Sequence, residues 1–168
     1  MKDVNFLEIL NDYSNKFCKN NCLLTTNYQK EPLKVVFNIF DLFHLFGIHK
    51  VTNLTSTEWV KLVKDNKFSL KDYRNIEDVL PRIDSYYFLS EIFFKNNVEV
   101  LILGKDIRTN TMRLSIVFYK ENYKKQTVVL GLRADKRNNY RPATLHVSRI
   151  NKYKNYRKTK ITNIEWLE

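Results

Sequence analysis

The sequence contains few of the residues on which several common kinds of site depend. Its 168 residues include three glycines, three prolines and two cysteines. The glycines, at positions 47, 104 and 131, are too far apart to build a phosphate-cradling loop, which excludes the P-loop and the dinucleotide-binding motif. Cys18 and Cys22 have no histidine near them in the sequence, so they do not form a zinc site on their own. The sequence shows no compact acidic cluster of the kind that holds magnesium for phosphodiester cleavage, so a metal-dependent nuclease stays open as an alternative without support from the sequence.

Long apolar runs are missing as well. The most apolar stretch, residues 33–48, is interrupted by Lys34, Asn38, Asp41 and His44, so it does not span a membrane. The N-terminus lacks the apolar core of a signal peptide. With 43% hydrophobic residues, the chain has enough apolar side chains for a core. The sequence therefore predicts a cytoplasmic single-domain protein over residues 1–168, without membrane association and without a cofactor.

What the sequence has in abundance is positive charge, and the charge is concentrated near the C-terminus. The net charge is +11, and residues 133–160 contain a single acid, Asp135. The cations of this region are Arg133, Lys136, Arg137, Arg141, Arg149, Lys152, Lys154, Arg157, Lys158 and Lys160. Such a field attracts polyanions, most often nucleic acid. Tyr140, Tyr153 and Tyr156 lie among the cations, and aromatic faces can stack on bases. A merely solvated lysine-rich surface is the alternative interpretation.

Hydrophobic periodicity predicts helices first and strands last. Residues 3–19, 57–66 and 75–94 have helical spacing, the last with a break near Pro81. Alternating patterns predict an early hairpin at 23–27 and 33–39, then strands at 99–103, 112–119, 126–132 and 144–150, and a fifth at 161–166. We therefore expect an α+β fold in which N-terminal helices pack on a C-terminal antiparallel sheet of four to five strands. Residues 1–96 would be mostly helical apart from the hairpin, and residues 97–168 would form the sheet with a basic rim.

The segment from Asp41 to Lys50 holds two of the three histidines. Asp41 is a candidate helix N-cap and Gly47 a candidate terminator, with His44 inside the helix and His49 just past its end. Five residues apart, the two histidines would lie on different sides of one helix, so they do not form a zinc pair. A hydrogen-bonded core histidine is the alternative for His44. The third histidine, His146, lies in an alternating strand and is assigned to structure.

The chemistry that remains is a metal-free site of His, Arg, Lys and hydroxyl groups. RNA permits such a site, because its own 2′-hydroxyl can attack the adjacent phosphorus. The reaction needs a base, an acid for the leaving 5′-oxygen, and cations for the phosphate oxygens. The residues of suitable type are His44, Lys50, Arg133, Tyr140 and Thr144. The sequence alone does not show that they converge.

Two short motifs resemble a known family. His44-Leu45-Phe46-Gly47 is similar to the His-Leu-x-Gly signature of the phage barnase–EndoU–colicin–RelE-like nucleases. Tyr140-Arg141-Pro142-Ala143-Thr144 resembles their late Tyr-x-Pro-x-Ser strand start, with Thr144 in place of Ser, and a basic tail that contains Tyr153 follows it. The resemblance implies a nuclease core of the RelE-like kind and a metal-independent ribonuclease, often a toxin, a defence protein or a phage-encoded effector.

The first interpretation is accordingly an endoribonuclease that leaves a 2′,3′-cyclic phosphate on an RNA such as tRNA or mRNA. Its expected catalytic residues are His44, Arg133, Tyr140 and Thr144, with Arg141 helping Arg133 to clamp phosphate. The expected RNA-binding residues are His49, Lys50, Arg137, Arg141, Arg149, Lys152 and Tyr153. An antitoxin or inhibitor protein is a second expected partner. Two alternatives stay open: a non-catalytic RNA- or DNA-binding module, and a phage or host-defence protein that grips an acidic protein partner.

Overall fold

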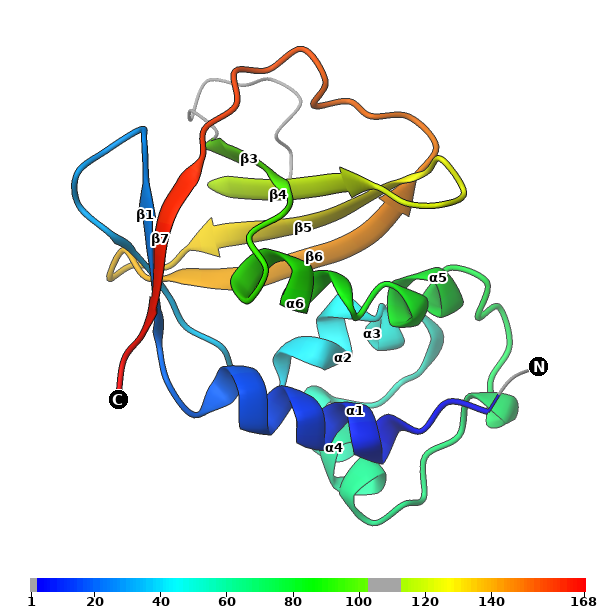
Figure 1. Cartoon of the computed structure of the whole chain (residues 1–168). Helices are drawn as coiled ribbons and strands as arrows, with labels where there is room; N and C mark the ends of the chain where they lie inside the picture. Colours follow the sequence, from blue (N-terminus) through cyan, green and yellow to red (C-terminus); the bar gives the residue numbers. More distant parts are fainter. Residues whose placement is uncertain (1–2, 103–112) are drawn as a thin grey trace.

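The computed structural model describes residues 3–102 and 113–168, and Figure 1 shows how their elements are arranged. The helical elements are α1 (Phe6–Tyr13), a π-helical turn (Ser14–Cys18), α2 (Asp41–Leu45), α3 (Ile48–Val51), α4 (Ser56–Lys64), a 3₁₀ turn (Leu70–Asp72), α5 (Val79–Asp84) and α6 (Phe88–Phe93). The strands are β1 (Cys22–Thr26), β2 (Leu33–Val35), β3 (Glu99–Ile102), β4 (Ile116–Glu121), β5 (Thr127–Ala134), β6 (Tyr140–Ser148) and β7 (Ile161–Trp166).

All seven strands form one mixed sheet in the order β3-β4-β5-β6-β2-β1-β7. The α+β class is as predicted, but the expected sheet of four to five strands is wrong, because the early hairpin joins the C-terminal strands. β2 lies parallel to β6, where Val36 N donates to the carbonyl oxygen of Tyr140 over 2.9 Å. β1 pairs antiparallel with β7. Hydrophobic alternation predicts that a strand exists, but it does not say which distant strand is its partner.

The two ends of this sheet approach each other. Thr159, two residues before β7, forms an antiparallel bridge with Val100 of β3, and its N–H donates to the Val100 carbonyl over 2.8 Å. Because β3 and β7 stand at opposite ends of the strand order, this contact requires the sheet to curl. The curl is visible in Figure 1 as the red strand β7 beside the short green strand β3.

The sheet is covered on both faces. The helices gather on one side of it, as Figure 1 shows, and bury the larger apolar core, which includes Phe118, Leu130 and Leu145. The other face is covered at β4 and β5 by residues 149–160, which we call the strap. Tyr153 of the strap is buried against Tyr119 of β4, with ring centroids 6.2 Å apart. Cover on both faces explains why six successive residues of β5, 127–132, are all buried.

Several predicted boundaries change in the helical layer. The helix expected over 75–94 is divided into α5 and α6, but the break lies at residues 85–87 and not near Pro81, which is in the first turn of α5. Ser85 ends α5 by donating both its N–H and its hydroxyl to the Pro81 carbonyl. The predicted strand ends at 103 and 112 lie outside the described residues. Across residues 3–102 and 113–168, no helix combines the length and apolar character needed to cross a bilayer.

Candidate active site

The segment that holds His44 and His49 folds as two short helices with a sharp turn between them. Gly47 has φ +72°, a left-handed conformation that favours glycine, and its N–H donates to the His44 carbonyl as α2 ends. α3 then starts at Ile48, so His49 lies in a helix rather than past the end of one. The turn brings the rings of His44 and His49 to 5.0 Å between centroids. The expectation that these histidines lie on different sides of one helix is therefore wrong.

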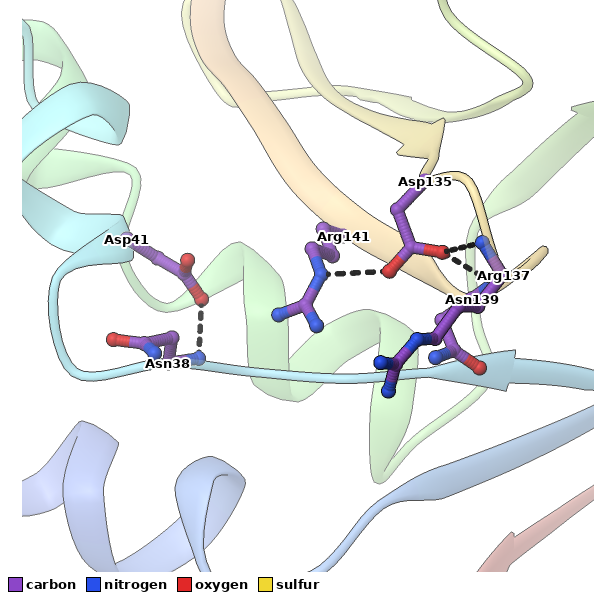
Figure 2. Close-up of polar contacts among 6 residues, drawn as sticks. All are labelled: Asn38, Asp41, Asp135, Arg137, Asn139 and Arg141. Carbon is purple, nitrogen blue, oxygen red and sulfur yellow. Dashed lines mark hydrogen bonds and ion pairs between the residues drawn. The ribbon is translucent and has the colours of Figure 1, made fainter.

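Asp41 anchors the start of α2, but not as the N-cap that the sequence predicts. Phe40 occupies the cap position and Asp41 is the first helical residue. Its Oδ2 accepts hydrogen bonds from the Asn38 N–H over 2.7 Å and from the Tyr13 hydroxyl over 2.6 Å. These bonds tie α2 to the preceding loop and to α1, and Figure 2 shows the first of them. Burial raises the pKa of the Asp41 carboxyl to about 6.

The sheet contributes Thr144 and His146 from one face of β6. Thr144 Oγ1 lies 3.1 Å from His146 Nδ1, and both residues are on the face opposite Leu145, which is in the larger core. The pairing of β5 with β6 is shifted between Gly131 and Leu132, which pair with Thr144 and Pro142, so Ala143 is an extra residue on β6. Such a bulge redirects neighbouring side chains and accommodates a proline.

These elements line an open cavity of about 410 Å³, at which His44 and His49 are exposed. Its lining residues are Asp41, His44, His49, Lys50, Arg82, Arg133, Pro142, Ala143, Thr144 and His146. The cavity thus contains all three histidines of the protein, three cations and a buried threonine hydroxyl. His44, Arg133 and Thr144, expected to be catalytic, lie in the same cavity as His49 and Lys50, expected to bind RNA.

The surroundings of the cavity favour the uncharged imidazoles of His49 and His146. Burial lowers the pKa of His49, and the neighbouring His44 lowers it further. Burial likewise lowers the pKa of His146 to about 4, with added repulsion from Arg82, Lys152 and Lys50. At neutral pH His146 is therefore uncharged and can accept a hydrogen bond or a proton. Within residues 3–102 and 113–168, no three His, Cys, Asp or Glu side chains are grouped so as to hold a metal ion.

Comparison with protein families gives a match over nearly the whole chain. Residues 5–167 match the family described as phage-Barnase-EndoU-ColicinE5/D-RelE like nuclease 4. The chain belongs to this nuclease family. The resemblance predicted from the two short motifs is thus confirmed. Comparisons with curated proteins and with solved structures gave no significant match.

Two residues of this nuclease-family site were not expected from the sequence. Arg82 comes from α5, and its Cδ and Nε would both lie 3.5 Å from a Cβ placed on Gly47, so the side chain passes close to that turn. No local pattern points to Arg82. His146, assigned to structure, is half-buried and lines the cavity. Its spacing of two residues from Thr144 is the signal that would have placed both side chains on one strand face.

Other predicted residues of this nuclease-family protein lie away from the cavity. Tyr140 packs against the larger core and bonds β2 through its carbonyl. Arg141 is not among the lining residues, and its Nε forms an ion pair with Asp135 Oδ2 at 3.0 Å. Figure 2 shows Arg141 between Asp135 and Asp41, and also Arg137 in the adjacent turn, whose N–H donates to Asp135. The exposed residues Arg137 and Arg141 therefore flank the site rather than line it.

The remaining predicted RNA-binding residues are in or next to the strap. Arg149 lines a different cavity beside α5. Lys152 lies over the ring of Tyr153, with Nζ 5.2 Å from its centroid. Tyr153 itself is only 5% exposed, so its ring packs on Tyr119 and is not open to a base. The expectation that Tyr153 stacks on RNA is thus at odds with its position, whereas Lys152 is exposed near His146.

Proposed function

We propose that the protein is a metal-independent endoribonuclease that cleaves RNA by attack of the 2′-hydroxyl on the adjacent phosphorus. The observation that carries the proposal is the convergence of three imidazoles, three cations and a hydroxyl around one cavity of about 410 Å³. Membership of a nuclease family supports the reaction class. The choice of RNA follows from the side chains, because an internal 2′-hydroxyl nucleophile needs only acid–base groups and positive charge.

His44 and His49 are the proposed acid and base. Their ring centroids are 5.0 Å apart, and, after burial, the neighbouring His44 is the next cause that lowers the pKa of His49. The lowered pKa of His49 suits it to take the proton of the 2′-hydroxyl. His44 would then give a proton to the leaving 5′-oxygen.

The other cavity residues would hold and neutralise the phosphate. Arg82 from α5, Arg133 from β5 and Lys50 from α3 present positive charge from three directions. Such preorganised charge stabilises the extra negative charge of a pentacoordinate transition state. Thr144 would bond a phosphate oxygen, with its hydroxyl oriented by His146 at 3.1 Å. Arg141 and Tyr140 would support β6 rather than contact the phosphate.

The proposed biological setting is a phage, toxin or defence effector that acts on tRNA or mRNA. The family description, which includes phage, colicin and RelE, supports this setting. A ribonuclease of this kind requires control, so an antitoxin or inhibitor protein is a proposed partner. A basic surface that binds RNA without cleavage is the competing function, and the charge of +11 accounts for it equally well.

The deciding experiment is cleavage of total RNA and purified tRNA in EDTA by the wild type, His44→Ala and Arg82→Ala. Arg74→Ala serves as the matched control, since Arg74 is exposed and does not line the cavity. We expect cleavage by the wild type and the control, with rates reduced about 100-fold or more in the two cavity variants. Products should carry 2′,3′-cyclic phosphates. Equal RNA retention by all four proteins without cleavage would leave a binding module instead.

A further inference from the structure

The strap carries positive charge away from the proposed active site. Residues 149–160 contain six cations and no acid. The strap begins directly after β6, the strand that carries Thr144 and His146 of the cavity. It then crosses the outer face of the sheet, where Lys158 Nζ lies 5.9 Å from the ring centroid of Tyr119 in β4. It reaches β3 at the bridge between Thr159 and Val100.

At its far end the strap lines a second groove, of about 560 Å³. Arg157, Lys158 and Lys160 contribute to its lining, and none of the described residues that line it is acidic. Tyr28, which also lines the groove, is 68% exposed. The N–H of Asn27 donates to the Lys160 carbonyl over 3.0 Å, so the loop that carries Tyr28 is fixed to the strap. Among the described atoms, Thr159 Oγ1 is buried without a hydrogen-bond partner.

We propose that this groove binds the phosphodiester backbone of the RNA strand at a distance from the scissile bond. The proposal rests on the function proposed above and extends it to a second contact with the same substrate. Cations spaced along the strap would follow the strand from the cavity to Arg157 and Lys160, and the open face of Tyr28 would stack on a base. β3 lies three strands from β6, or about 14 Å across the sheet. A dinucleotide is too short to bridge that separation, whereas an oligonucleotide is not.

RNA fits these observations better than an acidic protein does. Exposed cations alone would attract either polyanion. An exposed aromatic ring beside a groove lined by three cations is the arrangement that single-stranded nucleic acid uses. Lys158 is partly neutralised by Glu99, 4.0 Å from its Nζ, so Arg157 and Lys160 are the better positions to test.

The test is the affinity of single-stranded RNA in the His44→Ala background, measured for a dinucleotide by calorimetry and for a labelled dodecanucleotide by fluorescence anisotropy. Arg157→Glu with Lys160→Glu should weaken dodecanucleotide binding by at least about 10-fold and leave the dinucleotide unaffected. The slope of log Kd against log salt should fall by about 1.4, since each single-strand phosphate contact contributes about 0.7. Tyr28→Ala should weaken the dodecanucleotide by about 10-fold.

The matched control is Lys64→Glu with Lys67→Glu, which makes the same change in net charge on an exposed part of the helical layer. An equal loss in this control, or an equal loss for the two RNA lengths, would overturn the proposal. So would an unchanged dodecanucleotide affinity combined with lost binding of an acidic peptide. If the charge-reversed variant, Arg157→Glu with Lys160→Glu, has a lower melting temperature than the wild type, the test is repeated with the neutral variant Arg157→Gln with Lys160→Gln.

Cleavage assays separate this proposal from the function on which it rests. Suppose that the wild type cleaves no RNA, while the groove variants still lose length-dependent binding. The proposed ribonuclease activity is then wrong, and the proposed RNA-binding groove is supported. If the groove variants cleave a dodecanucleotide with unchanged KM and kcat, the ribonuclease activity is supported and the RNA-binding groove is wrong. The expected result is a raised KM for the dodecanucleotide with kcat and the dinucleotide unchanged.

Discussion

Replacement of Asp41 by asparagine should stabilise the protein at neutral pH. Asp41 is half-buried, and burial raises the pKa of its carboxyl to about 6, against an ordinary value of about 3.9. Its Oδ2 accepts both hydrogen bonds that the side chain makes, from Tyr13 and Asn38. An asparagine Oδ1 can accept the same two bonds without a charge. The substitution therefore removes the cost of burying the charge while keeping the contacts.

The size and sign of the effect follow from proton linkage. A raised pKa means that the native protein binds a proton that the unfolded chain has already lost, so stability falls as pH rises through about 6. The difference between a pKa of about 6 and one of about 3.9 corresponds to about 3 kcal/mol. The stability of Asp41→Asn relative to wild type should thus increase by up to about 3 kcal/mol between about pH 4 and pH 7. His146, whose pKa is lowered to about 4, acts in the opposite direction, but it is present in both proteins and cancels in the difference.

Urea denaturation at several pH values in this interval measures that difference directly. Asp135→Asn is the control, because its effect on stability should change with pH in the opposite direction. Burial raises the pKa of Asp135, but hydrogen bonds from Arg141, Asn139 and Arg137 outweigh burial and leave it below the usual value. Asp135→Asn should therefore become more destabilising as pH rises. If Asp41→Asn shows the same trend as Asp135→Asn, the charge of Asp41 is stabilised by its surroundings and the reasoning from burial is refuted.

Three further predictions concern the turn, the bulge and the acid–base pair. Gly47→Ala should cost about 1–2 kcal/mol in urea denaturation, because φ is +72° there. Gly131→Ala would place a Cβ 2.6 Å from Leu114 Cδ1 and 3.0 Å from Thr144 Cγ2. It should therefore lower the free energy of unfolding by about 1–3 kcal/mol and lower kcat. An unchanged kcat would indicate that Thr144 takes no part in the reaction. His49→Asn should lower kcat/KM by about 100-fold or more and remove the acid limb of the pH–rate profile. In the wild type that limb should lie below pH 6.5, since the pKa of His49 is lowered.

The sequence predicted local features of this protein better than distant pairings. The strand at 161–166 has the predicted bounds, and Gly47 ends a helix as expected, because both features depend on neighbouring residues. The sheet was underestimated because β1 and β7 lie at opposite ends of the chain, and alternation carries no information about partners.

The site was predicted in part for the same reason. His44, Arg133 and Thr144 were chosen by residue type, and the fold brings them together. Arg82 could not be chosen, because its place in the cavity depends on how α5 packs beside the turn at Gly47, which is a tertiary contact. The position of His146 in the cavity was not predicted, because an alternating strand shows which residues share a face but not whether that face is covered.

Because β1 pairs with β7, the early strand β1 cannot complete its hydrogen bonding until the much later strand β7 is present. Cys22 is opposite Trp166, so β1 is synthesised long before one of its two neighbours. Contacts of such sequence separation close late and slow folding. Until β7 docks, one edge of β1 presents unpaired backbone groups that favour aggregation. We expect a chain that ends at residue 160 to aggregate on refolding, as light scattering would show, and a monodisperse truncated protein would contradict this. A cell that makes this protein would thus obtain the complete sheet only after β7 has left the ribosome.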